Sequence, residues 1–75
     1  MTTDEARAFV LKTVCAGPPV TAGDLLRMAR LMGYVGPATY RAIDRALQYH
    51  RRAGRIVYRD LAWSKPGRRA TRTKR

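Results

Sequence analysis

The sequence has little of the material from which proteins build catalytic and metal sites. Its 75 residues include one cysteine, one histidine and five acidic side chains. Cys15 is alone and forms no intramolecular disulfide, which fits a reducing compartment. Because acid–base catalysis and metal binding need several such groups at one place, we expect no enzyme, no metal site and no cofactor.

Long apolar runs are also missing. No stretch approaches the ~20 consecutive apolar residues of a membrane helix, and the mixed charges near the start differ from a secretory signal. Glycine-rich phosphate loops and nucleophile-elbow patterns are absent as well. We therefore expect a cytoplasmic protein that has no membrane partner.

Positive charge is abundant and unevenly distributed. Sixteen Lys and Arg against five acids give a formal net charge of +11. Residues 1–64 carry 10 basic and 5 acidic side chains, whereas residues 65–75 carry six basic and no acidic ones. Since runs of like charge cannot bury apolar surface, we expect one folded domain over 1–64 and a disordered basic tail over 65–75. The excess charge indicates a polyanionic partner.

Hydrophobic periodicity and end signals predict three helices, over residues 3–16, 22–32 and 37–53. Thr2 with Glu5, and Thr21 with Asp24, fit capping boxes, and Pro37 suits a first helical turn. The side chains expected to face inward are Ala6, Phe9, Val10, Thr13 and Val14, then Leu25, Leu26, Ala29 and Met32, then Ile43, Ala46, Leu47 and His50. His50 is the only histidine and is expected to be structural.

After Gly54 the apolar period shortens from about 3.6 to about 2 residues. The β-favouring runs 55–59 and 61–64 flank Asp60 and predict a short hairpin, with Val20–Thr21 as a candidate third strand. The expected fold class is therefore mainly helical α+β, with three helices followed by a C-terminal β-hairpin.

The face of the third predicted helix opposite its apolar side is rich in basic residues. At about 100° per residue, this stripe contains Arg41, Arg45, Gln48 and Arg52. An α-helix fits the DNA major groove, where Arg pairs with guanine and Gln with adenine. The stripe is thus typical of base readout. Further residues are placed to contact the sugar-phosphate backbone: Arg51, Arg52, Arg55, Arg59, and in the tail Lys65, Arg68 and Arg69.

The run from Leu31 through Leu47, with its continuation over residues 52–56, resembles winged helix-turn-helix DNA-binding domains. The likeness covers roughly residues 3–64. It implies that the helix over 37–53 is a recognition helix and that the Gly-basic-aliphatic step after it opens a wing. Carried over residue by residue, it implies groove-facing positions for Thr39, Tyr40, Arg41, Arg45 and Gln48, core positions for Ile43 and Leu47, and a wing-tip position for Arg59.

The sequence therefore predicts a small protein that binds double-stranded DNA, either reading its sequence or shaping it. We expect a transcriptional regulator or accessory factor associated with the nucleoid, with a phage as a candidate source. A homodimer would extend the small footprint of a single domain, with the free face of the first helix as candidate pairing surface. Two alternatives remain open: an RNA-binding or ribosome-associated protein, and an interaction module that occupies an acidic host protein.

Overall fold

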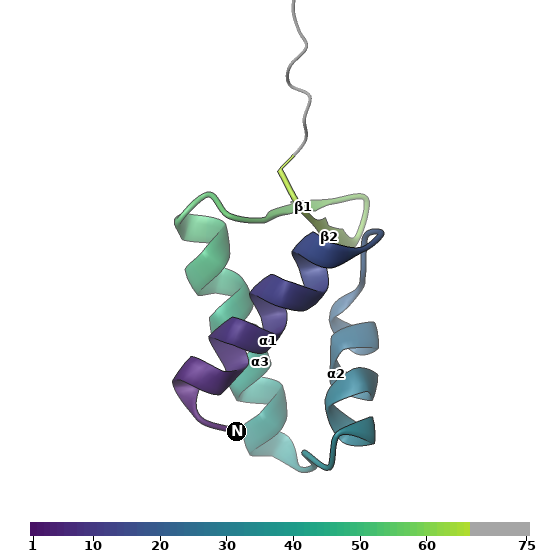
Figure 1. The fold of residues 1–75 in the computed structure, drawn as a ribbon, viewed down its shortest axis with the longest axis vertical. Helices are drawn as coiled ribbons and strands as arrows, with labels where there is room; N and C mark the ends of the chain where they lie inside the picture. Colours follow the sequence, from purple (N-terminus) through teal and green to yellow (C-terminus); the bar gives the residue numbers. More distant parts are fainter. Residues whose placement is uncertain (67–75) are drawn as a thin grey trace, which may run out of the picture.

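The structure, a computed structural model, describes residues 1–66. The predicted positions Arg68 and Arg69, with most of the predicted tail, lie outside the described residues. The chain folds as a mainly helical α+β domain of three helices followed by an antiparallel hairpin (Figure 1). The elements are α1 (Thr3–Ala16), α2 (Ala22–Leu31), α3 (Pro37–Arg52), β1 (Val57–Arg59) and β2 (Ala62–Ser64).

Both capping boxes are formed as predicted. The Thr2 hydroxyl accepts a hydrogen bond from the Glu5 amide at 3.1 Å, and the Glu5 carboxylate accepts one from the Thr2 amide at 2.7 Å. Thr21 and Asp24 make the same reciprocal pair at 3.0 and 3.1 Å. Two amides at each helix start, which have no partner inside the helix, are thereby satisfied. The helix starts are fixed by local side chains.

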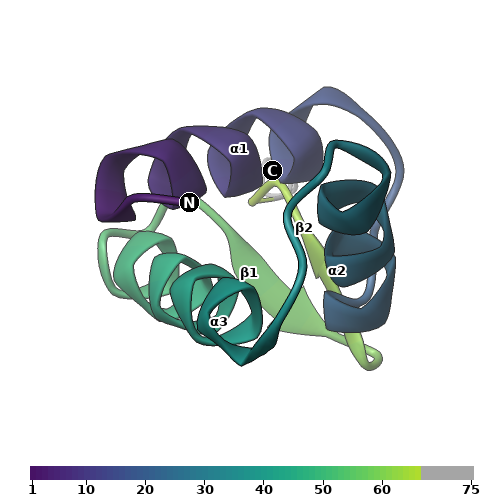
Figure 2. The ribbon, with the colours of Figure 1, turned by 90° about the horizontal axis from the view of Figure 1, so that it is seen from below.

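The three helices contribute to one small core, and Figure 2 shows how they are arranged. α1 packs mainly against α3, and α2 packs against α3 as well. Most predicted inward positions are buried or half-buried. The buried apolar side chains are Ala6, Val10, Val14, Val20, Leu25, Ala29, Ile43, Ala46, Leu47, Ile56 and Trp63.

Met32 is a correction to the predicted core, because its side chain is 59% exposed. The helix ends one residue earlier than predicted, and the chain turns at Gly33, whose φ is 99°. The Gly33 amide bonds to the Arg30 carbonyl at 2.9 Å and the Tyr34 amide to the Ala29 carbonyl at 3.0 Å. This Schellman arrangement directs Tyr34, rather than Met32, against the core.

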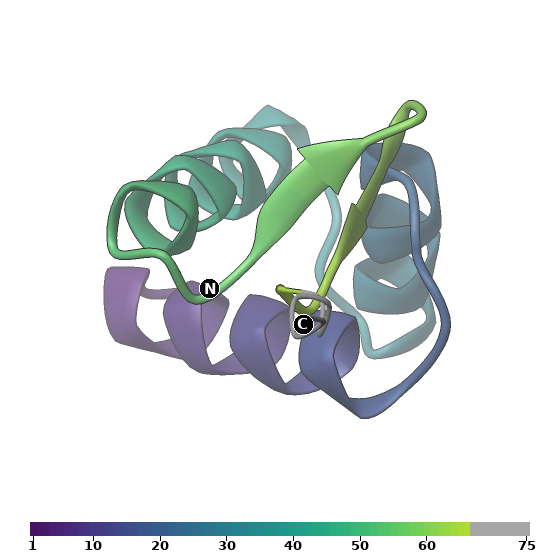
Figure 3. The same ribbon diagram turned by 90° about the horizontal axis from the view of Figure 1, so that it is seen from above.

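The hairpin is joined to the link between α1 and α2. Tyr58 pairs with Trp63 across the two strands, and Trp63 also pairs with Val20 through main-chain hydrogen bonds of 2.9 and 2.7 Å. The predicted third strand is therefore a single-residue bridge. Trp63 is buried, so the hairpin lies against the helices across one end of the bundle (Figure 3).

His50 connects α3 to α1. Its Nε2 atom lies 2.8 Å from the Arg7 carbonyl oxygen, and because a carbonyl can only accept, Nε2 carries the proton. The ring is 4% exposed, as the structural interpretation of this residue requires. Cys15, half-buried in α1, lies with its thiol 3.8 Å from the Arg55 carbonyl oxygen. These contacts hold the end of α3 and the segment after it against α1.

The capping carboxylates make folding sensitive to acid. Hydrogen bonds from the backbone amides of Thr2 and Thr21 hold the pKa of Glu5 and of Asp24 below their ordinary values. A carboxyl whose pKa is lowered by folding stabilises the fold when the pH is above its pKa in the unfolded chain. This contribution is lost as the pH falls through its pKa in the folded protein. We expect the melting temperature to fall as the pH drops from about 5 toward 3.

The Glu5→Gln/Asp24→Asn double variant keeps a side-chain oxygen at both caps and removes both titrating groups. Its melting temperature, followed by circular dichroism over the same pH range, should fall less steeply than that of the parent. Identical acid dependence in the two proteins would contradict a role for these carboxylates.

Candidate nucleic-acid interface

α3 buries one side and exposes the other. Ile43, Ala46, Leu47 and His50 are buried. On the opposite side, at helical spacing, three guanidinium groups are exposed and one amide is half-exposed. This surface, named here the α3 basic face, consists of Arg41, Arg45, Gln48 and Arg52. The sequence placed these four residues on the side of the helix away from the core, and the structure has them there.

Thr39 is a correction to the predicted set of groove-facing residues. Its side chain is 4% exposed, and its hydroxyl donates a hydrogen bond to the Val35 carbonyl at 3.3 Å. The residue lies one turn before Ile43, on the buried side of the helix. Thr39 therefore closes the turn that precedes α3. Its neighbour Tyr40 is 56% exposed and lies beside that turn.

Within residues 1–66, no acid forms a salt bridge with the guanidinium groups of the α3 basic face. Over the residues that the structure describes, the one salt bridge joins Arg27 to Asp24 on α2, at 3.0 Å. Asp44 is exposed on α3 but forms no such pair with Arg41 or Arg45. The α3 basic face consequently presents positive charge to solvent, which favours contact with an anion.

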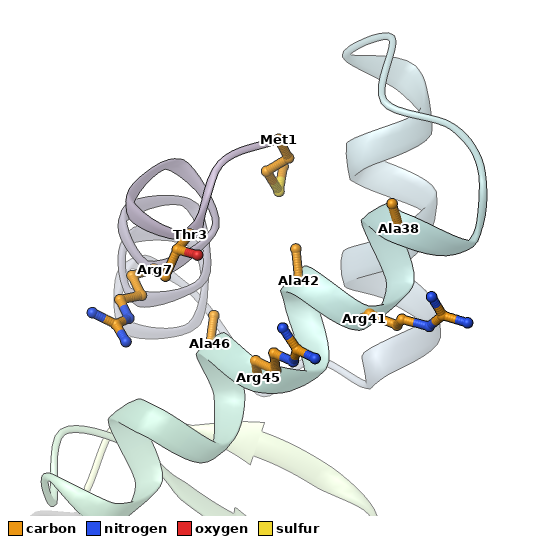
Figure 4. A pocket seen from close by; sticks show the side chains of 8 residues that line it. All are labelled: Met1, Thr3, Arg7, Ala38, Arg41, Ala42, Arg45 and Ala46. Carbon is orange, nitrogen blue, oxygen red and sulfur yellow. The ribbon is translucent and has the colours of Figure 1, made fainter.

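A hollow of about 510 Å³ lies between the start of α1 and the first half of α3. Arg41 and Arg45 extend from α3 at its edge, as Figure 4 shows, while Arg7 extends from α1. The other α3 residues lining the hollow have short side chains that do not fill it: Ala38, Ala42 and Ala46. Cationic side chains thus lie on both of the helices that border this hollow.

Arg7 is a candidate site residue that the sequence did not indicate. Its guanidinium carbon lies 3.7 Å from the centre of the Tyr49 ring, and that of Arg55 lies 5.8 Å from the same ring. Cation–π stacking of this kind holds a guanidinium in place while leaving its N–H groups free. Arg7 is far from α3 in sequence, and no local signal marks it. Only the packing of α1 on α3 brings it there.

The remaining predicted positions flank α3 at its end and along the hairpin. Arg51, Arg52, Arg55, Arg59 and Lys65 are all exposed. The Nη1 atom of Arg51 donates a hydrogen bond to Oε1 of Gln48 at 3.5 Å. A second hollow, of about 370 Å³, separates α3 from the hairpin and is lined by Gln48, Arg51, Tyr58 and Leu61 among others. The hairpin therefore faces α3 across this hollow, on the side of the helix where Gln48 and Arg51 lie.

An apolar hollow of about 600 Å³ lies elsewhere, between α1 and α2, where Phe9, Val20, Met28 and Met32 contribute to it. No α3 residue lines it. Among residues 1–66 there is no group of three or more His, Cys, Asp or Glu side chains able to hold a metal. Over the same part of the chain, no helix has the length and apolar character needed to cross a membrane.

The order of elements is compatible with a winged helix-turn-helix: α1, the Val20 bridge, α2, a short turn, α3 and then the hairpin. Comparison with protein-family models, curated proteins and solved structures found no match for this chain.

The stacking of Arg7 on Tyr49 can be tested directly. Tyr49→Leu keeps an apolar side chain but removes the ring, so it should release Arg7 and lower the free energy of unfolding by about 0.5–1 kcal/mol. Nuclear magnetic resonance should then show the Arg7 side-chain protons losing their ring-current shift. Tyr49→Phe is the matched control and should retain that shift. Unchanged Arg7 resonances in Tyr49→Leu would show that the contact is not formed in solution.

Proposed function

We propose that this protein binds double-stranded DNA, with α3 in the major groove. The observation that carries the proposal is the α3 basic face, whose guanidinium groups are exposed and form no salt bridge within the described residues. An α-helix has the width that the major groove admits. Since the opposite side of α3 is buried, the helix is held with its basic side outward.

In this proposal the residues of α3 divide into two sets. Arg41 and Arg45 are positioned to pair with guanine O6 and N7, and Gln48 with adenine N6 and N7. Tyr40 contacts the edge of the same groove. Arg52 lies one turn beyond Gln48, where the helix approaches the phosphate backbone.

Cations on both flanks of α3 support the same arrangement. Arg7, stacked on Tyr49, lies on the side of α1, and Arg59 lies on the hairpin. Arg51 and Arg55 lie between them, near the end of α3. Phosphates of the two strands border the major groove, so cations on each side of a helix in the groove are placed to fix its register. The tail residues Lys65, Arg68 and Arg69 extend the phosphate contacts in this proposal.

The proposed biological role is that of a small regulator or accessory factor on the nucleoid, in a bacterial or phage setting. One domain of this size reads a short site, so useful specificity requires repeated sites or a second copy. Self-association through the free face of α1 remains a prediction, and light scattering at increasing protein concentration tests it.

Selection from a random duplex library, repeated at low and at moderate salt, tests the proposed function. A recovered motif supports sequence reading, and affinity without a motif supports an architectural binder. No retention of duplex at low salt contradicts the proposal. Stronger binding to structured RNA in direct competition would instead support the RNA-binding alternative, and one stoichiometric protein from nuclease-treated lysate would support the interaction-module alternative.

Substitution in the α3 basic face should separate base readout from attraction by charge. Arg41→Ala and Arg45→Ala should each weaken binding to the selected site by about 1–3 kcal/mol and relax its sequence preference. Lys12→Ala is the matched control, because it removes one positive charge beside the apolar hollow and should leave the preference intact. Fluorescence anisotropy with matched and mismatched duplexes provides the measurement. Equal weakening on every sequence would count against base readout.

The flanking cations should control the dependence of binding on salt. If about six to eight phosphates are neutralised, the logarithm of the binding constant should fall with the logarithm of salt concentration at a slope of about −5 to −7. Arg51→Ala and Arg55→Ala should each flatten this slope by about 0.9 without changing the preferred sequence. A titration series in potassium chloride measures it. A slope unaltered by either substitution removes that residue from the phosphate contacts.

A further inference from the structure

The turn of the hairpin contains residue types that are unusual for its backbone conformation. Asp60 and Leu61 connect the strands as a two-residue loop, and both have positive φ, at 55° and 65°. Hairpin loops of this kind strongly favour Asn-Gly or Asp-Gly, because both loop residues must adopt a left-handed conformation. Asp60 fits, since a short polar side chain tolerates that region. Leu61 stands where glycine is preferred.

The strained backbone conformation of Leu61 is not offset by burial of its side chain. Its side chain is 77% exposed and belongs to neither the core nor its half-buried surroundings. Leu31 and Val35 are also exposed but have ordinary backbone conformations. Among the non-glycine residues that the structure describes, positive φ is confined to the two turn positions. Strained backbone that stabilises no packing is characteristic of functional positions.

The position of Leu61 connects it to the proposed DNA site. Leu61 and Tyr58 line the hollow that separates the hairpin from α3, opposite Gln48 and Arg51. The hairpin beneath is firmly supported, because Tyr58 contacts the buried Trp63 with ring centres 4.7 Å apart. An apolar side chain thus lies at the same hollow as the cation Arg51 and the carboxylate of Asp44, and Arg59 directly precedes the turn.

We propose that Leu61 is an apolar wedge, which enters the base stack next to the groove occupied by α3, unstacks one base step and bends the duplex. This inference rests on the proposed DNA binding. Proteins that kink DNA insert leucine, phenylalanine or methionine between base pairs while cations hold the adjoining phosphates. Arg51 and Arg59 supply such cations here, and they offset the repulsion between Asp60 and the phosphates.

Leu61→Gly is the decisive variant, because strain and function predict opposite effects. Glycine adopts the left-handed conformation without cost, so the variant should melt at a higher temperature than the parent. It should nevertheless lose the ability to unstack bases. Leu61→Met restores an apolar wedge and should recover that ability. Leu31→Ala, which removes an exposed leucine from α2, is the matched control and should behave as the parent.

The probe is a short duplex of the selected sequence, or of mixed sequence if no motif is recovered, with 2-aminopurine substituted at successive positions and a fluorophore at each end. The parent protein should raise 2-aminopurine emission several-fold at one step and increase energy transfer between the ends. Leu61→Gly should bind the duplex with neither change.

The outcomes separate this inference from the function on which it rests. If the parent binds duplex without either optical change, or if Leu61→Gly retains both, then the wedge is wrong and DNA binding stands. If the parent does not bind duplex in anisotropy measurements at low salt, the proposed function fails and the wedge fails with it.

Discussion

The packing of α1 on α3 determines where the arginines of the α3 basic face point. Ile43, Ala46 and Leu47 bury one side of α3, and the hydrogen bond from His50 to the Arg7 carbonyl sets the helix against α1. Because that side is buried, the guanidinium groups on the opposite side of the helix point into solvent. The same contact brings the Arg7 side chain to the border of the α3 basic face. The buried interface between α1 and α3 thus positions cations from both helices.

Much of this architecture follows from local signals in the sequence. The capping boxes at Thr2 and Thr21 and the proline at the start of α3 mark helix starts whose geometry depends only on neighbouring residues. The change of period after Gly54 marks the hairpin in the same way. These features were predicted because each side chain acts within a few residues of its own position.

Three positions differ from the prediction or were missed by it: Met32 and Thr39 for reasons close to them in the chain, and Arg7 because of a contact between distant residues. Met32 fits a helical stripe, but the Schellman turn at Gly33 puts Tyr34 against the core instead. Thr39 matched a groove-facing position by resemblance, whereas its spacing from Ile43 places it inside. Arg7 lies beside Tyr49 only because two helices cross. Periodicity describes one helix at a time, and it carries no information about which residues meet across an interface.

The bridge between Val20 and Trp63 has a mechanical consequence. Val20 is bonded through its main chain to the hairpin, and its side chain lines the apolar hollow between α1 and α2. A change in the tilt of the hairpin would therefore be passed directly to Val20, and through Val20 to the wall of that hollow.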